Sequence, residues 1–404
     1  MHKRMQAGAD ETTGAGALPL SGIRVVEFCQ VAAGPFSSML LADMGADVVK
    51  IESPAGDGLR QWPPFEQGFS HNFASLNRNK RSVMLNLKED ADRDSARALI
   101  LQSDVVIENN RPGVMDRLGL GYERFAAQKP GLVYCSISAF GQSGPRRDQG
   151  GFDVTIQAVS GIMSVTGEPG GAPVKCGVPL SDFATGLYAA FSITALLRQV
   201  RETGRGGYID VSLMGSSLGV AALQTSEYFG SKIDPRKLGS AHPRNAPYQA
   251  FAARDGYLVV AAGNDKLWRS FCDVIAQPDL AGEERFSSTS LRARHQEELR
   301  QIVEKAFQDR SVDDLISQCS AVGVPCAPIN TYSCALADPQ VEHMGWVQEM
   351  ELPTGSTIPT FVSPISIDGK VAGIWRGAPD LGEHTDEVLA ELAATPADSD
   401  RAAK

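Results

Sequence analysis

Short apolar runs alternate with longer stretches of helical periodicity through the first half of the chain. Runs that are rich in Val and Ile and apolar on both faces predict β-strands. Because helical patterns separate several of these runs, the order is that of βαβ units, which form parallel sheets covered by helices on both faces. The pattern predicts an α/β fold with a Rossmann-like sheet. The expected strands are Ile23–Phe28, Asp47–Glu52, Ser82–Leu87, Asp104–Glu108, Leu132–Ile137 and Tyr208–Leu213.

The pattern changes at about Ser231. Residues 231–247 form a polar, proline-bearing linker, and residues 248–263 predict a hairpin with a turn at Asp255 and Gly256. Two helical patterns follow, the second opened by a capping box from Ser311 to Asp314. We therefore expect a smaller α+β domain over residues 231–330, further strands and a short helix after it, and a disordered lead over residues 1–17. The local pattern alone predicts consecutive domains and an ordinary dimer.

One helix carries a candidate for chemistry. Residues 183–201 are apolar on most faces and precede Gly204, which predicts a buried helix with Ser181 or Asp182 as its N-cap. The positive end of the helix dipole favours an ionised carboxylate, so we expect Asp182 to be charged, exposed and able to act as a nucleophile. Asp before a helix is also an ordinary cap, and local sequence leaves both interpretations open.

Composition excludes several classes of partner. The chain has 404 residues, of which 43% are hydrophobic, enough for a large core. Its net charge of −10 and the lack of a Lys/Arg run argue against nucleic acid, and any anionic ligand needs a local positive pocket. No stretch resembles a secretion signal or approaches the apolar length of a membrane span. Seven scattered cysteines without a CxxC pair indicate reduced thiols and a cytoplasmic protein.

Short motifs narrow the chemistry further. The chain has no GxxxxGK[ST], no GxGxxG after a strand and no clustered His and Cys, which disfavours a kinase, a dehydrogenase and a metal site. The loop CQVAAGPF follows the first strand, with a helix expected from Ser37, at the sheet edge where open α/β folds bind ligands. Small residues there allow close approach of a ligand, or simply of the helix. Lys80 and Arg81 form a basic cluster suited to phosphates or to an ordinary surface.

Six segments, in the same order, resemble the class III CoA-transferase family between about Leu18 and Leu392. They are GIRVVEFCQVAAGPFSSMLLADMGADVVKIE, LNRNKRSVMLNLK, DVVIENNRPGVMDRLGLGY, LVYCSISAFGQSGP, the stretch around LSDFATG, and LGEHTDEVLAEL. The resemblance implies a large domain built from residues 18–230 and 331–404, a small domain over residues 231–330, and two chains threaded as an interlocked homodimer.

The same resemblance implies roles for single residues. Asp182 would be the nucleophile that forms an aspartyl-CoA thioester, with coenzyme A as a substrate and no further cofactor. Arg117 could pair bidentately with a CoA phosphate. The positions that match CoA contacts of the family are Val31, Ala32, Ala33, Ser53, Leu85, Asn109 and Arg117.

Departures from the family pattern refine the reaction. The racemase branch has a His before the Asp of its GHD segment, whereas here Phe152 precedes Asp153 and cannot take a proton, although Asp153 can still orient the site. The glycine run of formyl-CoA transferases is also missing. The segments LGSAHPRNAPYQAF, DGYLVVAAGN and GVPCAPIN resemble the branch that moves CoA from succinyl-CoA to short dicarboxylates such as glutarate, itaconate, citramalate or mesaconate.

A dicarboxylate acceptor needs cationic partners for its second carboxylate. The candidates are Arg60, His242 and Arg244. The last two could reach the other chain's site, and they equally suit a polar linker. The alternatives are an α-methylacyl-CoA racemase, a CoA-transferase for formate, oxalate or carnitine, and a CoA-binding protein without turnover.

Overall fold

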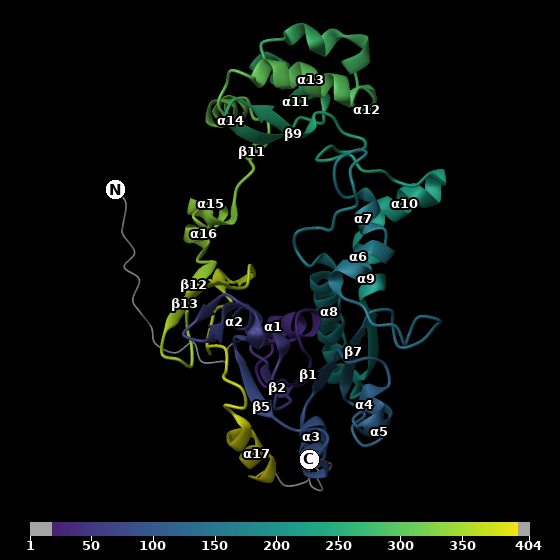
Figure 1. Ribbon diagram of the computed structural model, residues 1–404, viewed down its shortest axis with the longest axis vertical. Coiled ribbons are helices and arrows are strands. Elements are labelled where there is room, and N and C mark those ends of the chain that lie inside the picture. The colour runs from purple at the N-terminus through teal and green to yellow at the C-terminus, as the bar shows by residue number, and fades with distance from the viewer. Residues whose placement is uncertain (1–17, 395–404) are drawn as a thin grey trace. The chain divides into compact units, whose positions relative to one another are not determined.

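The computed structural model describes residues 18–394, which form two compact units (Figure 1). The Rossmann-like unit contains the described chain up to Ser160, Gly177–Thr225 and the chain from Gln340 onward. The small unit contains Gly161–Cys176 and Ser226–Pro339. The large unit is thus interrupted by residues 161–176, and its last part begins at 340 rather than 331. The lead expected over residues 1–17 lies outside the described residues.

The Rossmann-like unit is built on a parallel sheet of six strands in the order β5-β2-β1-β6-β7-β8. Numbered along the chain, this is the order 3-2-1-4-5-6, which reverses between β1 and β6. The α/β fold with a Rossmann-like sheet is confirmed. Its strands are β1 Arg24–Phe28, β2 Asp47–Glu52, β5 Lys80–Met84, β6 Val105–Glu108, β7 Val133–Ser138 and β8 Gly207–Ser212.

Helices cover both faces of this sheet because neighbouring strand residues point in opposite directions. Val25 belongs to a buried cluster that includes residues of α1 (Ala33–Asp43) and α8 (Leu180–Thr203), which lie side by side in Figure 1. The adjacent Val26 belongs to another cluster, shared with α3 (Asp90–Gln102) and α17 (Thr385–Ala394). This two-sided burial explains why the strands read as continuous apolar runs.

Shorter elements complete the Rossmann-like unit. Two antiparallel pairs, β12 with β13 and β14 with β15, come from the C-terminal part of the chain. The remaining elements are a 3₁₀ turn at Gly58–Gln61, β3 Phe65–Glu66, β4 Phe69–Ser70, α2 His71–Asn77, α4 Val114–Arg117, α5 Glu123–Ala126, α6 Asp153–Val159, α9 Leu213–Val220, α16 Pro339–Met344, β12 Val347–Glu351, β13 Thr357–Phe361, β14 Ser366–Ile367 and β15 Lys370–Val371. Helix α10, Ala222–Ser231, spans the boundary between the units.

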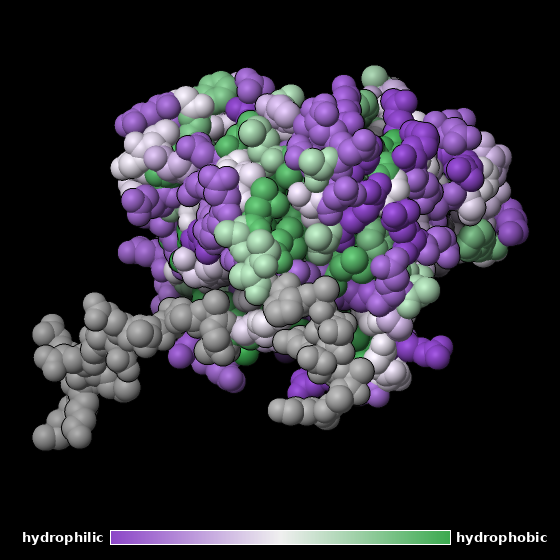
Figure 2. Space-filling view, turned by 90° about the horizontal axis from the view of Figure 1, so that it is seen from below, coloured by the Kyte–Doolittle hydropathy of each residue, from purple (hydrophilic) through white to green (hydrophobic). Residues whose placement is uncertain are grey.

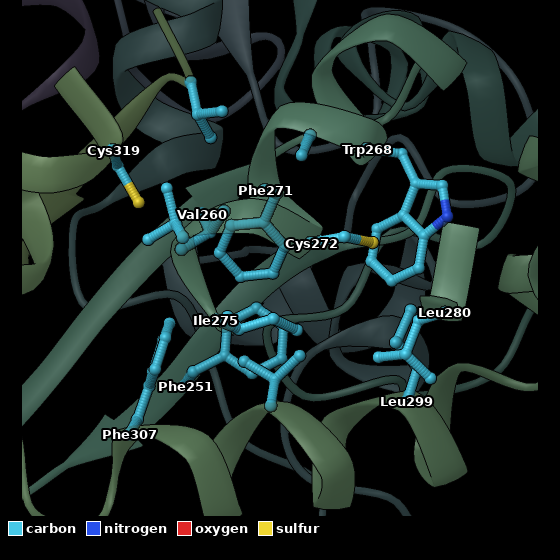
Figure 3. Packing of buried hydrophobic residues seen from close by; sticks show 14 of the residues in the cluster. Phe251, Val260, Trp268, Phe271, Cys272, Ile275, Leu280, Leu299, Phe307 and Cys319 are labelled. Atoms are coloured by element: carbon cyan, nitrogen blue, oxygen red, sulfur yellow. The ribbon is translucent and has the colours of Figure 1, made fainter. Parts of the chain in front are cut away.

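The small unit packs helices on an antiparallel sheet, β11-β10-β9. The expected hairpin is present, but its turn is Arg254 and Asp255, because Gly256 already pairs with Ala253. Figure 3 shows its core, in which Phe307 makes edge contacts with Phe251 and Phe271. The elements are α7 Ile162–Val165, β9 Tyr248–Ala253, β10 Gly256–Ala261, α11 Asp265–Val274, 3₁₀ turns at Pro278–Gly282 and Glu284–Phe286, α12 Thr289–Arg294, α13 Gln296–Phe307, α14 Val312–Ala321, β11 Cys326–Pro328 and α15 Tyr332–Leu336.

Helix α8 corrects two expectations. Its 24 residues contain an 18-residue stretch with a mean hydropathy of 1.4, which by length and composition alone is sufficient to cross a membrane, and the sequence analysis missed this. It is also less buried than expected, since Leu187 is 55% and Phe191 72% exposed. The face of the molecule shown in Figure 2 has hydrophobic residues in its central part among hydrophilic ones. All seven cysteines lie in the described chain and are free thiols.

Candidate active site

Asp182 lies in the first turn of α8, with its backbone inside the helix. The helix begins at Leu180 after an N-cap at Pro179, so neither Ser181 nor Asp182 is the cap, contrary to expectation. Asp153, the first residue of α6, takes over that function: its Oδ1 accepts a hydrogen bond from the N–H of Ser181 at 2.9 Å. The Asp182 carboxylate is therefore not needed to cap the helix and is available for chemistry.

The ionisation of Asp182 also differs from expectation. The side chain is partly buried rather than exposed. Burial, with the nearby charge of Asp153, raises the pKa of Asp182 to about 7, which outweighs the helix dipole. Near neutral pH the group exists as both acid and carboxylate, so its carboxylate is more basic than an ordinary aspartate.

Tight helix packing holds the first turns of α8, which carry Asp182, against the start of α1. The rings of Phe183 and Phe36 meet edge to face, with centroids 4.8 Å apart. A Cβ atom on Gly186 would lie 2.8 Å from the carbonyl oxygen of Ala33, so only glycine allows this approach of α8 to α1. Helix α1 begins at Ala33, not at Ser37 as expected, and no side chain caps it. Its first N–H groups can therefore donate to an anion or a carbonyl oxygen.

The loop between β1 and α1 is held from two sides. Asn109 exchanges two hydrogen bonds with the backbone of Gln30, at 2.9 and 2.8 Å. Val31 has φ of +65°, which is strained for a β-branched residue, and its N–H donates to the carboxylate of Asp57 at 3.0 Å. Gly34 allows α1 to approach β1, because a Cβ there would lie 2.4 Å from the Sγ atom of Cys29. The loop is thus a fixed backbone surface.

A cavity of about 260 Å³ lies at the carboxyl ends of β1, β2, β5 and β6. This edge includes the point where the strand order reverses, the usual ligand site of such sheets. Ser53 and Leu85, two of the expected CoA contacts, line it together with the cation Lys88. Asn110 and Leu118 also line it, next in sequence to Asn109 and to the exposed Arg117. The seven expected CoA positions all belong to the Rossmann-like unit.

Comparison with known proteins identifies the family. Residues 20–385 match CoA-transferase family III. This chain is a member of that family. It is 40% identical to a succinate–glutarate CoA-transferase of Agrobacterium fabrum over 93% of this chain and 96% of that protein. It is 37% identical to the human succinyl-CoA:glutarate CoA-transferase over 93% and 86% of the two chains.

Solved structures agree with the sequence comparison. A CaiB/BaiF family protein from Brucella suis superposes with a TM-score of 0.83 at 38% identity, over 93% of this chain and 99% of that one. The chain is therefore an enzyme, a class III CoA-transferase. Enzymes of this kind act on CoA thioesters, which is the chemistry that the carboxylate of Asp182 and the fixed loop beside it can support.

The basic cluster at Lys80 and Arg81 does not bind phosphate in this CoA-transferase. Lys80 is fully buried and pairs with Glu27 at 3.1 Å. Arg81 pairs with Asp47 and Glu391, both at 2.6 Å. The interpretation as a phosphate cluster was wrong because these strand residues point into the protein, where the acids of other elements neutralise them.

Arg60, a candidate for the acceptor's second carboxylate, is engaged within the protein. Its guanidinium makes two hydrogen bonds to Glu52, at 2.6 and 2.9 Å, and a third to the carbonyl of Pro379 at 3.1 Å. It also lies over the ring of Phe73. The bidentate pair leaves Arg60 a structural role in this geometry.

His242 and Arg244, the other two candidates, lie in the small unit. The Nδ1 atom of His242 accepts hydrogen bonds from the N–H groups of Arg244 and Asn245, both at 3.1 Å. Burial and the Arg244 charge lower the pKa of His242, so its imidazole is neutral rather than the expected cation. Arg244 pairs with Glu227 at 3.0 Å, and both partners are exposed enough for that pair to exchange for a substrate carboxylate.

Three residues of the site were not found from sequence. Asp57 and Lys50 hold the loop after β1, and Lys88 supplies charge to the cavity. A signal existed for Lys50, since a lysine within the apolar strand DVVKIE must be buried and needs an acidic partner. Within residues 18–394, no three His, Cys, Asp or Glu side chains form a group that could hold a metal ion.

Proposed function

We propose that this class III enzyme transfers CoA from succinyl-CoA to a short dicarboxylic acid, with Asp182 as the covalent nucleophile. An Asp182 oxygen attacks the thioester carbonyl, the C–S bond breaks, and CoA leaves as a thiolate from a mixed anhydride. The thiolate then attacks the aspartyl carbonyl and releases succinate, leaving an aspartyl-CoA thioester. The acceptor carboxylate repeats both steps in reverse, and one thioester replaces another.

The position of Asp182 carries this proposal. Its carboxylate is partly buried, carries a pKa of about 7, and lies in a helix turn packed against the uncapped start of α1. Burial makes the carboxylate a better nucleophile, and donors at the start of α1 can stabilise the oxyanion of a tetrahedral intermediate. The same unit holds the cavity at the sheet edge, where the nucleotide part of CoA would bind.

The names of relatives favour a dicarboxylate acceptor. Two relatives are named for glutarate and succinyl groups, and one from Haloarcula marismortui, 35% identical, is named a succinyl-CoA:mesaconate CoA-transferase. Another, from Acetobacter aceti and also 35% identical, is named for acetyl-CoA and oxalate. Arg244, and His242 as a neutral donor, remain the candidates that would reach the active site of the other chain in a dimer and contact the acceptor's second carboxylate there.

The direct test is to incubate the enzyme with succinyl-CoA and single acids, namely glutarate, itaconate, citramalate, mesaconate, oxalate and formate, and to follow product thioesters by mass. Transfer to glutarate, itaconate, citramalate or mesaconate, with none to formate or oxalate, supports the proposal. Hydroxylamine should trap the thioester on Asp182 as a hydroxamate in the wild type and in an Asp148→Asn control, whose carboxylate is 86% exposed. Transfer that persists in Asp182→Asn would refute the covalent step.

A racemase would show a different result. Without an acceptor acid, it would exchange the α-proton of a methyl-branched acyl-CoA with deuterated solvent. Phe152, which is 78% exposed at the N-cap of α6, offers no proton acceptor for that exchange. We therefore expect no deuterium incorporation.

We also propose that the enzyme works as a homodimer in the cytoplasm. A row of large apolar side chains on α8, α9 and α10 is exposed in the single chain, including Leu187, Phe191, Val220 and Leu223. Exposed apolar area of this kind indicates a protein interface. Light scattering should give a dimer mass for the wild type, and Phe191→Asp should shift it toward the monomer. A monomeric wild type at micromolar concentration would exclude the dimer.

A further inference from the structure

We infer that Asp57 and Lys50 are positioning residues: together they clamp the turn Cys29–Val31 in the backbone conformation that receives the CoA thioester. That the clamped turn receives a CoA thioester rests on the proposed function. The clamp itself is defined by contacts within the Rossmann-like unit.

Both ends of the turn are bound by this one ion pair. The ammonium of Lys50 donates to the carbonyl oxygen of Cys29 at 2.8 Å and pairs with Asp57 at 2.9 Å. The carboxylate of Asp57 accepts the N–H of Val31, at 3.0 Å to Oδ1 and 3.2 Å to Oδ2. The carbonyl that opens the turn and the N–H that ends it are thus connected through two side chains.

Lys50 is held in its charged form by acidic neighbours. Both side chains are fully buried, and Glu27 lies 3.4 Å from Lys50 as a second counter-ion. Although burial disfavours the ammonium, Glu27 and Asp57 raise the pKa of Lys50 well above its usual range. Asp57 is fixed in turn, because its N–H donates to Glu52 and its Oδ1 also accepts the N–H of Leu59.

The conformation of Val31 shows why a clamp is needed. Its φ of +65° lies in the left-handed region, which a β-branched residue avoids. Its side chain nevertheless packs against the buried cluster that contains Leu59, so replacement by glycine would lose apolar contact. Without an acceptor for its N–H, Val31 would relax toward an extended conformation and turn the following backbone, Ala32 and Ala33, away from Asp182.

The first measurement is hydrogen exchange at the Val31 amide in the full-length protein. In the wild type this amide should exchange slowly, because its proton is held by a buried carboxylate. Exchange as fast as in an unprotected loop would overturn the inference without any variant. In Asp57→Asn, protection should fall by about tenfold or more, since the amide of Asn cannot both accept from Val31 and neutralise Lys50.

The second measurement is CoA affinity by calorimetry together with succinyl-CoA kinetics. Asp57→Asn should weaken CoA binding and raise KM by about tenfold, with a smaller change in kcat, because the loss is one of positioning. Asp47→Asn removes another ion-paired carboxylate, at the start of β2 and away from the turn, and as the control it should leave KM unchanged.

The third measurement separates positioning from general stability. In a Val31→Gly background the left-handed conformation is unstrained, so Asp57→Asn should cost clearly less affinity there than in the wild type. An equal loss in both backgrounds would show that Asp57 only stabilises the fold, and would refute the clamp. Should the wild type bind no CoA at all, the proposed function fails, while slow exchange at Val31 would still establish the clamp.

Discussion

Asp153 caps the helix that carries Asp182 and, by the same placement, adds to the rise in the pKa of Asp182 that burial causes. The Oδ1 atom of Asp153 accepts the N–H of Ser181 at 2.9 Å, and its Oδ2 atom accepts a hydrogen bond from Gln157 at 2.7 Å. These donors hold Asp153 as a fixed negative charge near Asp182. One carboxylate thus positions the other and makes it more basic.

The pH dependence of turnover should report this pair. Since the attacking form of Asp182 is the carboxylate, kcat/KM for succinyl-CoA should fall as pH drops through about 7. Asp153→Asn removes the like charge and keeps a cap for Ser181, so the acid limb should move to lower pH. Initial rates from pH 5 to 9 measure this, with the exposed Asp148→Asn as the control. An unmoved limb in Asp153→Asn would contradict the coupling.

Neutralising Asp182 should stabilise the protein while it abolishes transfer. The pKa of Asp182 is raised in the folded state, so its ionisation disfavours folding. The resulting loss of folding free energy begins near pH 4, grows as the pH rises, and is complete above about pH 7. Asp182→Asn should therefore raise the free energy of unfolding at pH 8 by about 1–2 kcal/mol, allowing for screening of a partly buried group, and by less at pH 5. Urea unfolding at both pH values tests the sign; lower stability at pH 8 would contradict it.

The sheet could be predicted because its strands carry their own signal. Val and Ile on both faces mark buried parallel strands, and β2, Asp47–Glu52, was predicted to the residue. The contacts that define the site carry no such local signal. Asp153 lies 28 residues from Ser181. The search for an N-cap looked only next to the helix start, and it therefore chose Ser181 or Asp182 instead of Asp153.

Long sequence separation also explains why the environment of Lys80 and the composition of the small unit were not predicted. Lys80 reads as a surface residue until Glu27, 53 positions away, is placed beside it. Residues 161–176 join the small unit through contacts such as Lys237 Nζ to the carbonyl of Gly171, 66 positions apart. Pairings between distant segments depend on the completed fold, and periodicity does not encode them.

Gly186 should be essential for the close approach of α8, the helix that carries Asp182, to the start of α1. In Gly186→Ala, the new methyl group would lie 2.8 Å from both the Ala33 carbonyl oxygen and the Phe36 ring, so α8 must move away from α1. We expect a loss of about 1–3 kcal/mol in stability and a larger fall in kcat than in CoA affinity. The control is Gly230→Ala, another helical glycine, where a Cβ meets nothing within 4 Å. Equal behaviour of the two variants would refute the steric argument.

Arg60 should affect stability rather than acceptor binding. Arg60→Ala leaves the buried Glu52 without its bidentate partner and should lower the free energy of unfolding by about 3 kcal/mol. Adding Glu52→Gln removes the uncompensated charge and should recover part of that loss. The KM for the acceptor acid, measured in the double variant, should match the wild type. A raised acceptor KM there would restore the role in acceptor binding expected from sequence.

Arg117 should contribute to CoA binding through its charge. It ends α4, is exposed, and forms no ion pair among residues 18–394, beside the cavity residue Leu118. In Arg117→Gln, KM for succinyl-CoA should rise about fivefold to tenfold at low ionic strength. The difference from wild type should shrink in about 0.5 M salt, because salt at that concentration screens exposed charge pairs. Arg124→Gln, an exposed arginine on α5, should change neither value. A salt-independent effect, or one shared by Arg124→Gln, would show that Arg117 does not contact a CoA phosphate.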